Sequence, residues 1–397
     1  MLAASPSQRV RDPRLDFYRG IAMFIILCAH TPGNFFTSWI PARFGFSDAT
    51  EIFVFCSGMA SAIAFGGSYD RRGWLLGTAR VLFRCWQVYW AHICLFMFIV
   101  AMLFAINMAG DFETDYIGQL NLGRFRSDPG PQIVGLLTLT YVPNYFDILP
   151  MYIGILLMMP LVMALARVDP ILAIIACIGI WFLAQEDILA TLGIDRIAIS
   201  LPAEPWSERA WFFNPFAWQL IFFTGFAFVR GWLPRPPVNW ALTILALVIV
   251  LGNIPLSNVG ARELGFDGTN QWRTDNRMWI TKSDFGILRY VHFLGLAYLA
   301  YVIAGDGGHR LLPQGRNTIG RVWQNIVAMI TKVGQQSLAV FVFSMALARL
   351  SGFTMDQIGR DTWTVVAVNL IGFALLIVCA YTAAWFKGQP WRKSATG

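Results

Sequence analysis

The first apolar segment carries two side chains whose types and spacing suit acid–base chemistry. Arg19 and His30 are eleven residues apart, which on a helix is three turns plus roughly 20°. Both side chains therefore share one helix face, roughly 16 Å apart along the axis. His30 can act as a general base because the unperturbed pKa of histidine lies near neutrality; the alternative is a histidine hydrogen-bonded to a neighbouring helix. Asp16 lies one turn before Arg19 and can pair with it.

A pair of carboxylates opens the second apolar segment. Asp48 and Glu51 are three residues apart and would face the same side of a helix. Two such carboxylates can share a proton or orient a histidine, but an ordinary helix N-cap with a first-turn carboxylate has the same pattern. Ser57, Gly58 and Ser61 follow and allow close packing against another helix.

Cationic residues recur near the ends of other apolar segments. Arg80 and Arg84 are one turn apart and can hold a phosphate or carboxylate, although arginines there also anchor a protein at the cytoplasmic surface. Arg289 and His292 share a helix face, with Lys282 shortly before them. This group can hold a carboxylate end group, or it can be a buried polar network that braces the fold.

Asn144 and Asp147 precede the apolar run that begins near residue 150. Side chains of these types cap helices, and they also hydrogen-bond sugar hydroxyls. Both interpretations remain open from the sequence.

These polar groups lie in a chain dominated by apolar residues. Of 397 residues, 56% are hydrophobic and 13% are charged, about half the charged share of a soluble domain. This composition excludes soluble globular and disordered proteins and favours an all-α polytopic membrane protein. Ten stretches approach the length of about 20 residues that a span needs, at roughly 16–32, 49–66, 80–108, 150–168, 170–185, 211–230, 238–254, 285–304, 334–351 and 363–386.

Three features refine this list of spans. The run 132–142 is too short to cross and is expected to be re-entrant or interfacial. The stretch 322–333 is expected to lengthen the ninth span. The junction Asp169-Pro170 predicts a hairpin between the fourth and fifth spans.

The distribution of Lys and Arg predicts the orientation. With a cytoplasmic N-terminus, the inner segments are 1–19, 67–84, 167–170, 230–238, 305–333 and 387–397. They carry 18 Lys/Arg and 5 Asp/Glu, a net charge of +13. The remainder carries 12 Lys/Arg and 18 Asp/Glu, a net charge of −6. We therefore expect both termini in the cytoplasm, and we interpret the formal charge of +7 as a topology signal rather than as a sign of nucleic-acid binding.

The chain is expected to form a single integral-membrane domain over 1–397, with 1–15 as a cytoplasmic N-terminus and 387–397 as a cytoplasmic tail. Two polar outer segments, about 109–149 and 253–284, are long enough to shape a binding surface. The six cysteines lie in apolar runs without a C-x-x-C pair, so we expect neither disulfides nor a metal site. Motifs for nucleotide hydrolysis, dinucleotide binding and serine-hydrolase chemistry are absent from the sequence.

The first two polar clusters resemble a known family. The run LDFYRGIA over 15–22, followed by His30 eleven residues after Arg19, is similar to the opening of the transmembrane acyltransferase superfamily (acyltransferase-three type). The block DATEIFVFCSG over 48–58 resembles that family's D-x-F-F-x-L-S-G block, from which Glu51 departs. Arg80 and Arg84 stand where the family has an arginine-rich start to its third span.

Within that superfamily, the chain most resembles the osmoregulated periplasmic glucan succinyltransferases (OpgC-type). The similar segments are PNYFDILPMY over 143–152, LRYVHFLGLAY over 288–298 and GQQSLAVFV over 334–342. The resemblance implies about ten spans in the bacterial inner membrane, surrounded by lipid. It implies succinyl-CoA as a co-substrate from the cytoplasm, a periplasmic glucan as acceptor, and no permanently bound cofactor.

The resemblance also suggests roles for the polar clusters. His30 would deprotonate a sugar hydroxyl, with Asp48 or Glu51 orienting its imidazole and with Asp16 and Ser57 in support. The other assignments are acyl-CoA binding for Arg19, Arg80 and Arg84, binding of the acyl carboxylate or the oxyanion for Arg289, His292 and Lys282, and acceptor binding for Asn144 and Asp147.

Two alternatives remain open at this stage. One is an O-acetyltransferase that acts on another surface polysaccharide, because the acyl group is less certain than the reaction class. The other is a secondary transporter or flippase, which intramembrane charges permit. The sequence has no evident inverted repeat and no matched pair of broken helices, which disfavours transport.

Overall fold

The chain folds almost entirely into helices. The structure, a computed structural model, describes residues 12–312 and 317–392; within those ranges it contains no strand, only an isolated β-bridge between Pro202 and Ala210. The α-helices are α1 (Pro13–His30), α2 (Ala49–Ser61), α3 (Gly67–Ala109), α4 (Gly123–Ser127), α5 (Pro129–Thr138), α6 (Ile148–Val168), α7 (Pro170–Leu183), α8 (Glu186–Thr191), α9 (Pro215–Arg230), α10 (Trp240–Gly252), α11 (Asn258–Arg262), α12 (Thr269–Asp275), α13 (Arg277–Ile280), α14 (Ile287–Ala304), α15 (Thr318–Gln335), α16 (Ser337–Ile358) and α17 (Thr362–Gly388).

Six helical segments of the described chain are long and apolar enough to cross a membrane. They are Ala49–Ala109, Ile148–Val168, Trp240–Arg262, Ile287–Ala304, Ser337–Ile358 and Thr362–Arg392. The all-α membrane fold class is therefore confirmed. Each of the ten predicted ranges contains a helix, but the count of ten spans stays a prediction, because α1 carries three charges within its first turns and α7 and α9 are only 14 and 16 residues long.

Local sequence explains where several helices begin and end. Asp12 caps α1, whose first residue is Pro13. Asp169 caps α7 and accepts a hydrogen bond from the amide of Ile171, so the predicted break at Asp169-Pro170 is confirmed. The predicted second and third spans form one nearly continuous helical segment, interrupted by a π-helical turn at Ala62–Gly66 and by a kink at Gly73, where φ is 80°.

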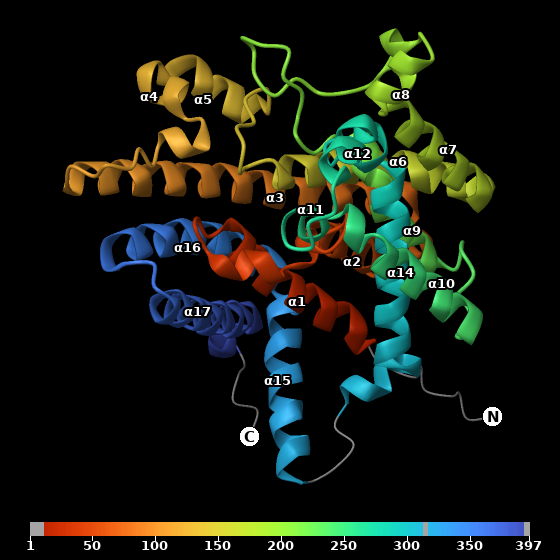
Figure 1. The fold of residues 1–397 in the computed structure, drawn as a ribbon. Helices are drawn as coiled ribbons and strands as arrows, with labels where there is room; N and C mark the ends of the chain where they lie inside the picture. Colours follow the sequence, from red (N-terminus) through yellow and green to blue (C-terminus); the bar gives the residue numbers. More distant parts are fainter. Residues whose placement is uncertain (1–11, 313–316, 393–397) are drawn as a thin grey trace.

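The expectation that 322–333 lengthens the ninth span is wrong. These residues belong to α15, which ends before Gln336, where φ is −104° and ψ is 29°. A new helix, α16, begins at Ser337, and Figure 1 shows that the two helices run in different directions. The run 132–142 overlaps the short helix α5, Pro129–Thr138, and its re-entrant or interfacial placement stays a prediction.

The helix α1 lies in the middle of the molecule, between α16–α17 on one side and α14 on the other (Figure 1). It packs against α2, α15 and α16. Close approach to α15 depends on glycine, because a Cβ on Gly20 would lie 2.0 Å from the carbonyl oxygen of Ile330. The same holds for α2 and α9, where a Cβ on Gly58 would lie 1.8 Å from the carbonyl oxygen of Phe222. The small residues of α2 thus serve the close helix packing that the sequence predicts.

Several contacts join segments that the charge distribution places on the same side. At one end, Arg14 donates to the carbonyl of Gly305, and Arg230 pairs with Asp70 at 2.7 Å. At the other end, the loop before α14 contacts the segments after α1 and after α8, through the pairs Lys282–Asp48 and Asn214–Asp284. The end of α16 contacts the segment after α3 through Tyr116–Asp356, and Arg360, just after α16, contacts the segment after α1 at Pro32. The site described next lies at this second end, which the sequence predicts to be the outer one.

Candidate functional site

His30 is the last residue of α1, and its ring is oriented by its own helix. Its Nδ1 lies 2.9 Å from the carbonyl oxygen of Ile26. Because a carbonyl oxygen only accepts, Nδ1 carries the proton in the neutral ring. The lone pair is then on Nε2, at the far side of the ring from the helix backbone. His30 therefore has the tautomer that a general base with a free Nε2 requires.

Tyr145 connects His30 to an arginine on α16. The rings of His30 and Tyr145 meet edge to face with centroids 5.4 Å apart, and the guanidinium carbon of Arg349 lies 4.3 Å from the centroid of the tyrosine ring. The Tyr145 hydroxyl donates to the carbonyl of Met345 at 2.6 Å. Tyr145 has a φ of 87°, an unfavourable value for a non-glycine residue, which is typical of functional sites.

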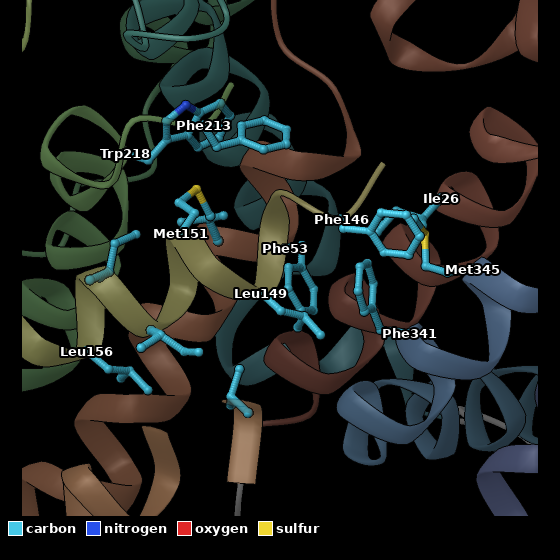
Figure 2. Close-up of a cluster of buried hydrophobic side chains, with 14 of the residues drawn as sticks. Ile26, Phe53, Phe146, Leu149, Met151, Leu156, Phe213, Trp218, Phe341 and Met345 are labelled. Carbon is cyan, nitrogen blue, oxygen red and sulfur yellow. The ribbon is translucent and has the colours of Figure 1, made fainter. Parts of the chain in front are cut away.

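Two adjoining cavities meet at these side chains. One, of about 350 Å³, and another, of about 470 Å³, share His30, Gln119, Tyr145 and Arg349 in their walls. The smaller cavity has mainly apolar walls, which include Ile26, Phe53, Ile148, Phe213, Phe341 and Met345. Figure 2 shows Phe53 and Phe341 side by side, in agreement with their stacked rings 5.9 Å apart. The larger cavity has a wall that is about equally polar and apolar, and Thr31, Asn34 and Thr37 are among its polar residues.

The carboxylates of α2 hold the start of that helix and are neutralised by cations. Asp48 and Glu51 form a capping box. The Asp48 carboxylate accepts from the main-chain amide of Glu51, and the Glu51 carboxylate accepts from the main-chain amide of Asp48 at 2.8 Å. Lys282 pairs with Asp48 at 2.5 Å, and Arg289 donates two hydrogen bonds to Glu51, at 2.6 and 2.9 Å. Arg289 also lies 3.9 Å from Asp48. The four side chains form one ion network, to which both carboxylates are committed.

This network corrects the predicted role of the two carboxylates. The partner that orients His30 is the carbonyl of Ile26, one helical turn away, and not Asp48 or Glu51. Burial by itself would raise the pKa of Asp48, but the charges of Lys282 and Arg289 outweigh it and hold that pKa well below its ordinary value. The capping interpretation of Asp48 and Glu51 is therefore confirmed, and Asp48 stays ionised beside the cavity.

His292 also braces the start of α2. Its Nδ1 lies 2.7 Å from the hydroxyl oxygen of Ser47, and the ring packs against Gly45, where a Cβ would lie 2.1 Å from Nε2. Of the three residues predicted to bind the acyl carboxylate or the oxyanion, only Lys282 lines the cavities described above. Arg289 and His292 belong to the bracing network, as the alternative interpretation of this cluster expects.

Asn144 and Asp147, the predicted acceptor-binding residues, both line the smaller cavity. The side-chain oxygen of Asn144 accepts from Arg209 at 2.9 Å. Asp147 stands at the N-cap position of α6 but makes no side-chain capping bond. It is 5% exposed, and burial raises the pKa of its carboxyl to about 7. The capping interpretation is thus wrong for Asp147, which leaves its carboxyl beside the cavity.

The predicted acyl-CoA residues lie apart from His30. Arg19 is buried and donates to the carbonyl of Cys56 at 2.9 Å, close to the buried Asp16 and Ser57. Arg80 donates to the Ser68 hydroxyl, and Arg84 contacts Gln87 at 3.1 Å. None of the three lines the cavities at His30. Arg19 shares α1 with His30, as the sequence spacing predicts.

Sequence reasoning missed Gln119, Tyr145 and Arg349, although all three line both cavities. Arg349 had a signal, because it is the lone charged residue in the predicted span 334–351, where an ionisable group is a functional candidate. Gln119 lies in a short 3-10 turn, Gly118–Leu120, and its role depends on how the segment after α3 folds over the end of α1.

Comparison with protein families agrees with this geometry. A family model described as "OpgC protein" matches residues 11–388, nearly the whole chain. The chain belongs to the OpgC family. Membership supports a transferase with a role in glucan succinylation, and the apolar helices support a membrane protein. No curated protein and no solved structure matches the chain.

Proposed function

We propose that this OpgC-family protein transfers a succinyl group from cytoplasmic succinyl-CoA to hydroxyls of periplasmic glucans, within the bacterial inner membrane. The observation that carries the proposal is His30, whose free Nε2 lies at the junction of a mainly apolar cavity and a more polar one. An apolar chamber suits the hydrocarbon part of an acyl group. The more polar chamber suits a sugar, whose hydroxyls need hydrogen-bond partners.

The chemistry follows from that placement. Nε2 of His30 takes the proton of a glucan hydroxyl as its oxygen attacks the thioester carbonyl carbon. The tetrahedral intermediate then collapses, the carbon–sulfur bond breaks, and the imidazolium returns its proton to the departing CoA thiolate. Thr31, Asn34 and Thr37 in the wall of the larger cavity offer hydrogen bonds to the sugar, and Asn144 and Asp147 reach it from the smaller cavity that adjoins it. Arg19, Arg80 and Arg84 lie nearer the opposite end, where we expect the CoA phosphates to bind.

The direct test is His30→Ala in cells that lack the native gene. We expect glucans from these cells to lose their succinyl groups, as measured by mass spectrometry, because the hydroxyl has no base. His309→Ala is the matched control, since His309 lies in the segment after α14, lines neither cavity and has its ring nitrogen 3.1 Å from the carbonyl oxygen of Asp306. Succinylated glucans from cells with normal levels of the His30 variant would refute the catalytic assignment.

Two further outcomes distinguish the alternatives. Acetylated instead of succinylated glucans from cells with the wild-type protein would favour an O-acetyltransferase. Purified protein that turns over acyl-CoA only with a glucan acceptor supports an enzyme, whereas ligand flux without acyl transfer would favour a transporter.

A further inference from the structure

The cations around His30 differ in their partners. Lys282 is committed to Asp48, and Arg289 to Glu51. Arg349 forms no salt bridge with any carboxylate in residues 12–312 and 317–392. A half-buried cation without a counter-charge is costly unless something binds it. The position of Arg349 therefore suits an anionic ligand that the protein itself does not supply.

The contacts of Arg349 hold it in place and leave its charge unneutralised. Its guanidinium stacks on the ring of Tyr145 at 4.3 Å and donates to the side-chain oxygen of Gln119 at 3.4 Å. Its Nε is buried and has no hydrogen-bond partner among the described residues. Tyr145 and Gln119 are both neutral, so they orient the planar guanidinium but do not neutralise its positive charge. A carboxylate could accept two parallel hydrogen bonds from such a group.

Arg349 and His30 flank the same aromatic ring. His30 meets Tyr145 edge to face, and Arg349 covers that ring at 4.3 Å. Both side chains line both cavities, and His30 interacts electrostatically with Arg349 and Lys282. A molecule that presents a reactive carbonyl to His30 and carries an anionic group a short chain away can reach Arg349. A succinyl thioester has this form, because its free carboxylate lies two methylene groups beyond the thioester carbonyl.

Asp147, the acidic residue in the wall of the smaller cavity, forms no salt bridge with Arg349 within the described residues. Burial raises the pKa of Asp147 to about 7, and its contact partners do not include Arg349. Lys282 adds a second positive charge to the wall, partly offset by Asp48. The chamber therefore attracts anions.

We propose that Arg349 binds the free carboxylate of the acyl donor, so that the enzyme selects dicarboxylic over neutral acyl groups. This inference rests on the proposed function and assigns to Arg349 the role that the sequence had suggested for Arg289, His292 and Lys282. Tyr145 positions the guanidinium, and its strained backbone places its ring between Arg349 and His30.

The test compares two donors of equal chain length on purified full-length protein with a glucan acceptor. Succinyl-CoA carries the carboxylate, and butyryl-CoA replaces it with a methyl group. We expect Arg349→Gln to lower kcat/KM about 100-fold for succinyl-CoA, as the loss of a bidentate charge-assisted contact implies, and to change the value for butyryl-CoA less than about threefold. Arg126→Gln is the control, because Arg126 lines neither cavity, is about half exposed and lies 3.9 Å from Asp115.

The outcomes separate this inference from the proposed function. No transfer from either donor by the wild-type protein refutes the proposed function. Wild-type protein that uses both donors equally, or an Arg349→Gln variant that loses both equally, overturns the role of Arg349 alone. If Arg349→Gln does not accumulate in cells, Arg349→Lys is measured instead. A fall in the preference for succinyl-CoA while butyryl transfer persists supports the inference. An equal change in transfer from both donors overturns it.

Discussion

At the scale of single residues, environment divides similar side chains into different roles. Asp48 and Asp147 are both aspartates at the start of a helix. Asp48 caps its helix and faces two cations, so its pKa falls. Asp147 neither caps nor pairs, and burial raises its pKa to about 7. One carboxyl is thus a fixed negative charge, and the other titrates near neutral pH.

Asp147 should make stability depend on pH. Its pKa in the folded protein lies above its ordinary value of 3.8, so its stabilising contribution is fully present below about pH 4 and is lost as the pH rises through about 7. Asp147→Asn removes this loss and should stabilise the protein at pH 8.5 by on the order of a few kcal/mol relative to wild type, but little at pH 4. Thermal unfolding in detergent at both values measures the difference.

The exposed Asp128 provides the control for this prediction. Asp128→Asn should leave the pH dependence of unfolding unchanged. If Asp147→Asn also unfolds with the wild-type pH dependence, the carboxyl is not held in an unfavourable environment, and its assignment as a buried titrating group is wrong.

At the scale of elements, an ion network joins the start of α2 to α14 and to the loop before it. Glu51 is fully buried and receives two hydrogen bonds from Arg289, which is 238 residues later in the chain. Lys282 adds a second link, to Asp48. The network thereby fixes the start of α2 against α14 and against Lys282, which lines the smaller cavity. We infer that its function is to position the site rather than to transfer protons.

Replacing Arg289 alone should lower the unfolding free energy more than replacing both Arg289 and Glu51. Arg289→Met leaves Glu51 buried and unpaired, and we expect a loss of roughly 3–5 kcal/mol in unfolding free energy. Adding Glu51→Gln should restore part of that loss, because the buried charge disappears. Denaturation of the single and double variants in detergent measures the coupling.

A surface ion pair provides the comparison. Arg126 and Asp115 are 3.9 Å apart and each about half exposed, so Arg126→Met should cost less than about 1 kcal/mol. A double variant that is no more stable than Arg289→Met alone would contradict the network as described.

The sequence predicted helices well and their partners poorly. The spacing of Arg19 and His30 places both on α1, as found, because helical geometry is local. The pairing of Glu51 with Arg289 depends on tertiary packing between distant segments, which residue spacing does not encode. The conformation of Tyr145 has φ of 87° although it is not glycine, so no local preference signals it. The separation of α15 from α16 was missed because the break at Gln336 contains neither glycine nor proline.

At the scale of the whole molecule, the site lies at one end of the helices and the predicted CoA-binding arginines lie nearer the other. Arg19 and His30 are at different levels of α1, roughly 16 Å apart along its axis. An acyl donor that enters beside Arg19, Arg80 and Arg84 must therefore extend through the protein to reach His30. This arrangement serves transfer across a membrane only if the end with His30 faces the periplasm.

Orientation is thus the property on which the function depends, and it can be measured by thiol labelling. In a variant whose six native cysteines are replaced by alanine, Ser207→Cys and Asn317→Cys place single thiols at exposed positions of opposite ends. With intact inner-membrane spheroplasts, we expect a membrane-impermeant maleimide to modify Cys at 207 before lysis and at 317 only after lysis. This expectation follows from the prediction that the segments with net charge +13 face the cytoplasm and that those near His30 face outward. The reverse pattern would place His30 on the cytoplasmic side, where no periplasmic glucan could reach it, and the proposed direction of transfer would fail.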